Sequence, residues 1–352
     1  MTRADRLEAL VRERELDALL VTDLVNVRYL TGYTGTNGLC VVGEGLRLFL
    51  TDFRYVTQAR GEVGDAFERE QGRQDLLEDA AKRLSGRVGF EDSSLTVRRH
   101  ERLAGYVGEG VELVAAGRLV EELRKVKDDG ELERIRAAAA LADEVFRLIP
   151  EVGLAGRTEH EVALELETAM RRRGSDPSFP SIVAGGANGA LPHARPGNGP
   201  IARDTLVVVD MGCVLDGYCS DCTRTFATGP LTDEAAEVYD LVLRTQVATL
   251  GEVRPGAACR DVDAFARERI EAAGHGERFG HGLGHGVGLE VHEQPTLSRA
   301  GEGELEAGNV VTVEPGVYVP DGFGVRIEDL VVVTESGGEV LSGFPKELTA
   351  VG

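Results

Sequence analysis

The sequence lacks any apolar run approaching the roughly eighteen residues that a membrane-spanning helix requires. The first ten residues, MTRADRLEAL, have little apolar character and are charged where a secretory signal would be hydrophobic, so we do not expect export. Basic residues are in short supply, with 39 Lys and Arg against 60 Asp and Glu and a formal net charge of −21. We therefore expect a cytoplasmic protein that binds neither membranes nor nucleic acid, since nucleic-acid partners require clustered Lys and Arg.

Cysteine is sparse as well, and its pattern favours no disulfide framework. Of the five cysteines, only Cys219 and Cys222 form a CxxC pair, and no second pair accompanies it. Such a pair could serve a zinc or redox site. The plainer interpretation is a set of reduced, partly buried thiols in a cytoplasmic protein.

The 352 residues suffice for two domains with sizeable cores, and 42% hydrophobic with 28% charged residues is typical of a globular protein. The first part alternates short apolar strands with helical patterns, which predicts a small α/β domain. The expected helices are 2–15, with Thr2 as N-cap, and 97–106, and the expected strands are 16–21, 39–42, 46–51 and 88–90. Residues 121–133, EELRKVKDDGELE, are predicted to form a charged, solvated connector. We place the domains at 1–124 and 125–352.

The second domain contains an internal echo. Its first half carries Gly156, Val162, Gly174 and Phe179, and the same residue types recur one hundred positions later as Gly256, Val262, Gly274 and Phe279. Strand 206–210 followed by Gly212 likewise matches strand 310–314 followed by Gly316. A period this long predicts two similar halves around a pseudo-twofold axis. A ligand would bind in the cleft between their sheets.

Each half presents acidic residues at equivalent places, Asp210 and Asp221 in the first and Glu314 and Glu328 in the second. The stretch 281–293, HGLGHGVGLEVHE, adds three histidines separated by glycines. A helix is not expected there, because each interior glycine would cost about 1 kcal/mol. An extended or looping backbone that passes close to another segment is the better prediction.

Four carboxylates in one cleft would raise one another's pKa values, so such a cluster is unfavourable without cations. Two divalent ions supply four positive charges and make it tenable. Oxygen ligands with one imidazole suit Mn²⁺ best, with Co²⁺, Fe²⁺ or Zn²⁺ as alternatives. Paired metals can activate a hydroxide and polarise a substrate carbonyl. The glycine-rich runs, by contrast, lack the strand and helix context of a nucleotide site.

Taken in order, five motifs resemble the M24 metallopeptidase family: DMG at 210–212, DCTRT at 221–225, HGLGHGVGLEVHE at 281–293, EPG at 314–316 and RIED at 326–329. Known members share a pita-bread fold and a dinuclear metal centre. NVRYLTGYTG at 26–35 resembles the N-terminal domain of aminopeptidase P and prolidase. The resemblance implies an α/β (α+β) protein, with a small creatinase-like α/β domain before a duplicated pita-bread catalytic domain.

The same resemblance implies the site residues. The metal ligands would be Asp210, Asp221, His285, Glu314 and Glu328, with Asp221 and Glu328 bridging two ions. Glu314 would also act as general base, and His193 and His292 would contact substrate or steady the tetrahedral intermediate. The substrate-binding candidates are His281, Phe179, which could wall a proline pocket, and Arg326 and Tyr318, which could orient carboxylates or substrate.

The predicted function is an Xaa-Pro aminopeptidase that removes the residue before a penultimate proline from peptide substrates. An Xaa-Pro dipeptidase is the alternative, less favoured because HEQP at 292–295 is followed by Thr296, not by an Arg that could bind the dipeptide's carboxylate; Arg299 could substitute. A metal-free creatinase-like hydrolase or a non-catalytic binding protein would be expected to have lost acids that are present here. The resemblance also implies a homodimer, with the small domain of one subunit close to the other's active site.

Overall fold

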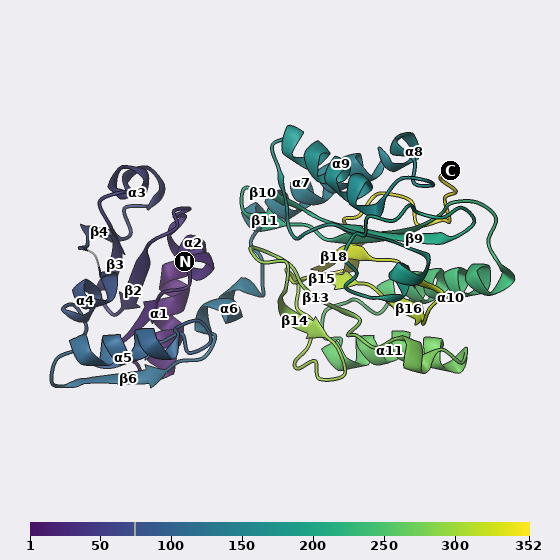
Figure 1. Ribbon diagram of the computed structural model, residues 1–352. Helices are drawn as coiled ribbons and strands as arrows, with labels where there is room; N and C mark the ends of the chain where they lie inside the picture. The colour runs from purple at the N-terminus through teal and green to yellow at the C-terminus, as the bar shows by residue number, and fades with distance from the viewer. Residues whose placement is uncertain (74) are drawn as a thin grey trace. The chain divides into compact units, whose positions relative to one another are not determined.

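The computed structural model describes residues 1–73 and 75–352, which form two compact units, Met1–Arg124 and Lys125–Gly352 (Figure 1). Each unit has its own sheets and its own hydrophobic clusters. Among these residues, no helix combines the length and the apolar character needed to cross a membrane.

The first unit is built on a six-stranded mixed sheet in the order β4-β3-β2-β1-β5-β6. Its strands are β1 (Ala18–Val21), β2 (Leu39–Gly43), β3 (Leu46–Thr51), β4 (Glu68–Gln71), β5 (Gly86–Phe90) and β6 (Val111–Ala115). The central strand β1 pairs antiparallel with β2 and parallel with β5, and all four of its residues are buried. This explains the continuous apolar run at its position, which is typical of a strand covered on both faces.

Six helices complete this unit: α1 (Arg3–Glu13), α2 (Leu24–Thr31), α3 (Val56–Glu62), α4 (Leu76–Ala81), α5 (Val97–Tyr106) and α6 (Leu119–Arg124). The predicted N-cap of the first helix is confirmed, because Thr2 and Asp5 form a reciprocal capping box. The helix predicted at 97–106 is confirmed with the same bounds.

The prediction of a solvated connector over 121–133 is wrong. Helix α6 occupies its beginning, α7 (Asp129–Phe146) starts within it, and the side chains of Arg124, Lys127 and Glu131 are buried. Lys127 pairs with Glu293, far along the chain within the second unit. The local run of charges did not reveal partners so distant in sequence.

The second unit contains four sheets. Their strand orders are β12-β9-β8, β14-β13-β15-β18-β19, β11-β10-β7 and β16-β17. The strands are β7 (Asp176–Pro177), β8 (Ile182–Gly185), β9 (Leu206–Met211), β10 (Cys213–Leu215), β11 (Tyr218–Cys219), β12 (Cys222–Ala227), β13 (Gly284–Gly286), β14 (Glu293–Leu297), β15 (Val310–Val313), β16 (Gly316–Val319), β17 (Phe323–Arg326), β18 (Asp329–Thr334) and β19 (Gly337–Val340). Besides α7, the helices are α8 (Ile149–Val152), α9 (Glu159–Arg172), α10 (Asp233–Leu250), α11 (Cys259–Ala272) and the short 3₁₀ turns η1 (Gly186–Ala190) and η2 (Gly276–Arg278).

The predicted duplication is confirmed in this unit. Helices α9 and α11 each contain 14 residues and occupy matching places in the two halves. The glycine that follows each helix, Gly174 or Gly274, has a φ of +81° or +86°, a conformation that other residues rarely adopt. Figure 1 shows α7 and α9 on one side of strands β9, β15 and β18, and α10 and α11 on the other. The paired sheets therefore lie between two layers of helices.

Candidate metal centre and active-site cleft

A cavity of about 530 Å³ lies in the second unit and is lined from both of its halves. From the first half it receives Phe179, Pro180, Ile182, Pro192, His193, Ala194, Arg195, Pro196, Asp210 and Asp221, and from the second His281, Gly282, Gly284, His285, His292, Thr296, Ser298, Glu314, Arg326 and Glu328. A volume of this size is typical of small-molecule sites. Of the residues predicted to be functional, only Tyr318 is missing from the described lining.

The five predicted metal ligands come together at the ends of neighbouring strands. Asp210 lies on β9, His285 on β13 and Glu314 immediately after β15, while Asp221 and Glu328 occupy the short turns before β12 and β18. Ligand atoms of Asp221, His285 and Glu328 lie within 4.8 Å of one another. Nε2 of His285 is 3.3 Å from Oε1 of Glu314 and 3.6 Å from Oδ2 of Asp221.

The glycines around His285 allow this convergence. Strand β13 is sandwiched between β14 and β15, with an irregularity in its pairing between His285 and Gly286. A Cβ atom at Gly284 would collide with the carbonyl of Thr312, and one at Gly286 would collide with the carbonyl of Gln294. Only glycine lets the main chain pass so close to its neighbours while it presents the imidazole to the acids.

The electrostatics of the cluster show how unfavourable it is without cations. Burial raises the pKa values of Asp221 and Glu328 well above their usual range, and the neighbouring carboxylates raise them further. Burial also raises the pKa of Asp210, against the opposing charge of Arg326. Burial alone would raise the pKa of Glu314, but its hydrogen bond to His285 and that residue's charge lower it instead.

Two buried carboxylate oxygens indicate that the five predicted ligands are suited to bind metal ions. Oδ1 of Asp210 and Oε1 of Glu328 have no hydrogen-bond donor within the described parts of the chain. A buried acceptor without a donor costs about 1–3 kcal/mol, which coordination to a cation would offset. Four carboxylates and one imidazole form a hard, mainly oxygen donor set that suits divalent ions. The five residues therefore fit a centre of divalent metal ions.

Arg326 organises the side of the cluster next to Asp210. Its Nη2 donates to Oδ2 of Asp210 at 2.7 Å, and its Nη1 donates to the hydroxyl of Tyr318 at 2.8 Å. Nε donates to Oγ1 of Thr223 at 3.1 Å, and Thr223 in turn donates to Oε2 of Glu328 at 2.7 Å. The guanidinium is thus occupied by protein groups and steadies two of the acids.

The histidines sit at different depths. His281 bonds through Nε2 to the hydroxyl of Tyr318 at 2.9 Å, and burial lowers its pKa. His292 is exposed, and its ring centroid lies 4.2 Å from that of His285. Partial desolvation of the ring lowers the pKa of His292, and the nearby His285 lowers it further. His193 is exposed on the loop that follows η1, so His193 and His292 reach the cavity from opposite halves.

Two residues of the site escaped the sequence analysis. Thr223 lies within the DCTRT motif but gives no separate signal for its hydrogen bonds. Arg195 lies between two prolines in LPHARPG, and only the fold shows that it lines the cavity. Arg299, the cation that sequence suggested as a substitute, is exposed and is not part of the described lining.

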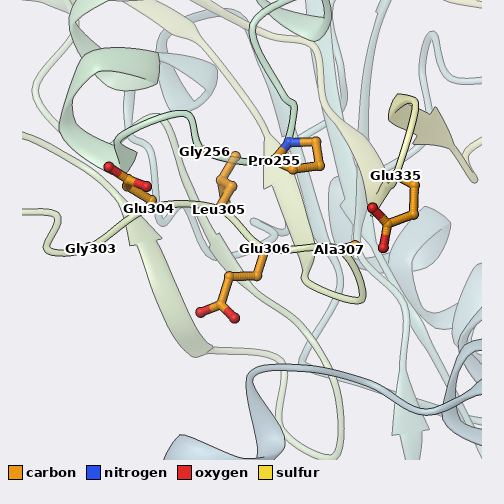
Figure 2. Close-up of a pocket in the computed structure, with 8 residues that line it drawn as sticks. All are labelled: Pro255, Gly256, Gly303, Glu304, Leu305, Glu306, Ala307 and Glu335. Atoms are coloured by element: carbon orange, nitrogen blue, oxygen red, sulfur yellow. The ribbon is translucent and has the colours of Figure 1, made fainter.

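A second hollow, of about 760 Å³, lies away from these groups and is lined by Pro255, Gly256, Gly303, Glu304, Leu305, Glu306, Ala307 and Glu335 (Figure 2). Its three carboxylates do not converge on one point in the view. None of the predicted site residues lines it.

The five cysteines are free and buried, with no disulfide among them. The chemistry therefore concentrates in the first cavity.

The two-halved fold and the acid and histidine cluster are those of a metallopeptidase. Residues 133–335 match the metallopeptidase family M24, residues 3–126 match the creatinase/prolidase N-terminal domain, and the chain belongs to the M24 family. It is 40% identical to the uncharacterized peptidase YqhT of Bacillus subtilis, over 98% of this chain and 99% of the relative.

Two solved structures extend the comparison. The Xaa-Pro dipeptidase from Bacillus anthracis is 37% identical with a TM-score of 0.95, over 99% of both chains. The X-Pro aminopeptidase from Thermotoga maritima is 34% identical with a TM-score of 0.90, over the whole of both chains. The predicted family, the pita-bread fold and the metallopeptidase class are thus confirmed. The alternatives of a metal-free creatinase-like hydrolase and a binding protein have no support among these relatives.

Proposed function

We propose that this chain is a metal-dependent exopeptidase that hydrolyses the bond between an N-terminal residue and a following proline. One observation carries the proposal: Asp210, Asp221, His285, Glu314 and Glu328 converge in a single cavity of peptide size. The similarity to enzymes named as Xaa-Pro dipeptidase and X-Pro aminopeptidase supports the choice of substrate.

The five converging residues would hold two divalent ions, and Mn²⁺ is the ion that best suits four carboxylates with one imidazole. When bound, the ions would supply an activated water nucleophile and polarise the scissile carbonyl. Glu314 takes the proton from the attacking water and passes it to the leaving nitrogen. The hydrogen bond from Oγ1 of Thr312 to its Oε1, at 3.1 Å, helps to orient this carboxylate.

The exposed imidazoles of His193 and His292 flank the reacting carbonyl and donate hydrogen bonds to substrate or to the oxygen that gains charge. His281, held by its hydrogen bond to Tyr318, contacts substrate within the same cavity. Arg326 acts through Asp210, because its guanidinium already bonds to protein groups.

Recognition of proline follows from its chemistry. A prolyl bond is a tertiary amide without an N–H, so an apolar wall must recognise the ring instead of a hydrogen-bond acceptor. Phe179 and Ile182 contribute such a wall. The positively charged α-amino group of the substrate lies against the carboxylates, which restricts cleavage to the first peptide bond.

Sequence favoured the aminopeptidase over the dipeptidase because Thr296 follows the HEQP motif. Relatives with both names are similar to this chain over nearly their full length. The cavity also contains Arg195, a cation that the sequence argument did not include. The dipeptidase is therefore a second candidate with a specific residue in its favour.

Product analysis tests the proposal. The Mn²⁺-loaded protein is incubated with Ala-Pro-Ala, Ala-Ala-Ala and N-acetyl-Ala-Pro-Ala, together with the dipeptide Ala-Pro, and products are separated by mass. We expect release of alanine from the free prolyl peptides, and little or none from the other two. Efficient cleavage of the acetylated peptide would contradict exopeptidase action, and preference for Ala-Ala-Ala would contradict proline recognition. The homodimer implied by the resemblance can be measured in the same preparation by light scattering.

A further inference from the structure

The side chain of Arg195 is an uncommitted cation at the cavity wall. It is exposed, and within the described residues its guanidinium takes part in no hydrogen bond or ion pair. Free guanidinium groups are ordinary on a surface in contact with water. Arg195, however, shares its cavity with the predicted metal ligands and with Phe179.

The backbone that carries Arg195 is held firmly although its side chain is free. The carbonyl of Arg195 accepts a hydrogen bond from Nδ2 of Asn188 at 3.2 Å. The buried carboxylate of Glu159 accepts bonds from Nδ2 of Asn188 and from the N–H of Gly197, both at 2.7 Å. Pro196 further restricts the backbone of the residue before it. The loop thus fixes the backbone from which the side chain of Arg195 extends to the cavity wall.

No other lysine or arginine of the described cavity lining is available for a substrate carboxylate. Arg326 is only 4% exposed and is bonded to Asp210 and Tyr318. Thr296 lines the cavity but offers only a hydroxyl, which donates to Gln294 at 3.3 Å. Among the described lysines and arginines, the lining contains only Arg195 and Arg326.

The cavity therefore has a negative region at the four carboxylates and a positive group in Arg195. Four carboxylates attract the ammonium end of a peptide, and a guanidinium would repel that end. A short peptide carries its carboxylate at the other end, next to proline when it is a dipeptide. Arginine binds carboxylates with two parallel hydrogen bonds, which adds orientation to charge attraction.

We infer that Arg195 binds the free carboxylate of the substrate on the leaving-group side and so makes this enzyme prefer Xaa-Pro dipeptides over longer chains. The inference rests on the proposed function, since it names the substrate length that the same cavity selects. Arg195 supplies to the cavity the guanidinium that Thr296 lacks.

Arg195→Gln tests this inference against Arg299→Gln, the exposed arginine outside the cavity lining. The substrates are Ala-Pro, its C-terminal amide and Ala-Pro-Ala, with all proteins loaded with Mn²⁺. Hydrogen bonds to charged groups contribute about 1.5–3 kcal/mol, which corresponds to roughly 10- to 100-fold. We expect Arg195→Gln to lower kcat/KM for Ala-Pro by about this factor, mainly through KM, and to leave the amide within about twofold. Arg299→Gln should match the wild type.

A binding measurement makes the inference independent of turnover. N-acetylproline and N-acetylprolinamide, neither of which has a free α-amino group, are titrated calorimetrically into the wild type, Arg195→Gln and Arg299→Gln. The acid should bind the wild type more tightly than the amide does, and Arg195→Gln should lose this difference. Equal acid affinity in wild type and Arg195→Gln, or loss of it in Arg299→Gln, would overturn the inference. Failure of the wild type to cleave any prolyl peptide would overturn the proposed function instead, whatever the acid binds.

Discussion

The Nη2 atom of Arg326 lies 2.7 Å from Oδ2 of Asp210, and both side chains are buried. The bond leaves the other oxygen of Asp210, Oδ1, without a donor within the described chain. Arg326 thereby fixes the carboxylate while one oxygen stays available to an ion. Partners that orient a metal ligand in this way typically affect metal affinity about 10- to 100-fold.

Arg326→Lys should weaken metal binding by roughly that factor, because an ammonium keeps the charge but cannot reach Asp210, Thr223 and Tyr318 together. Mn²⁺ affinity is measured by calorimetry, with folding checked by circular dichroism. Tyr318→Phe serves as the milder variant, since it removes a single hydroxyl, and should fall between Arg326→Lys and wild type. Unchanged affinity in a folded Arg326→Lys would contradict the positioning role.

Two substitutions in the proposed proton path should reduce activity to different extents. Glu314→Gln removes a ligand charge and the proposed base, whereas His292→Ala removes an exposed imidazole. We expect the first to lose more activity than the second, and His292→Ala to lose about 10²- to 10⁴-fold or less. The measurement is kcat/KM on Ala-Pro and Ala-Pro-Ala. Wild-type kcat/KM in His292→Ala would show that its assigned role is wrong.

Much of the fold could be predicted because its signals are local or repeated. Helix 97–106 is predicted with the bounds that the structure has, and the structure adds the hydroxyl of Thr96 as its N-cap. The hundred-residue echo reports positions where φ must be positive, as at Gly174 and Gly274, so the two halves are visible in sequence. The buried charges of Lys127 and Glu131 were not predictable, because their burial depends on contacts distant in sequence.

The same distinction applies to the site. Asp210 and Glu314 come at the ends of apolar strands in matched halves, so their meeting in one cavity could be predicted, and the structure places both in the cavity lining. Their chemical roles stay predictions. Arg195 carried no comparable signal: a single arginine between prolines resembles any surface loop, and only the folded chain places it in the cavity.

The ion pair between Lys127 and Glu293 should be important for stability. Its atoms lie 3.3 Å apart, and the two side chains are only 1% and 5% exposed. Lys127→Met leaves the Glu293 charge buried without its cation, which should cost about 3–5 kcal/mol of unfolding free energy. Lys82 is 53% exposed and pairs with Asp79 at 2.7 Å and Glu78 at 3.6 Å, so Lys82→Met should cost about 1 kcal/mol or less. Equal losses in urea denaturation would contradict the difference.

Glu91 should make stability depend on pH. Burial raises its pKa from the usual 4.5 to about 7, although it accepts hydrogen bonds from the N–H groups of Thr22 and Asp23. The folded state therefore holds a proton that the unfolded state has released. This contribution is fully present below pH about 4.5 and is lost as pH rises through about 7.

Glu91→Gln carries no titrating group at this position, so it should reduce the loss of stability between pH 5 and 8 relative to wild type (about three pH units). Urea denaturation of the two proteins at both pH values measures the difference, and contributions from the second unit cancel in the comparison. Identical pH dependence of the two proteins would contradict the raised pKa of Glu91.

The most direct test of the account is a metal titration of activity. The purified protein is stripped with a chelator, metal loss is verified by elemental analysis, and Mn²⁺ is returned in measured equivalents while hydrolysis of Ala-Pro is followed. We predict no turnover in the stripped protein, a lower melting temperature because the bound ions stabilise the folded state, and recovery that saturates at two ions per chain. Full hydrolysis of Ala-Pro by protein shown to be free of metal would contradict the account.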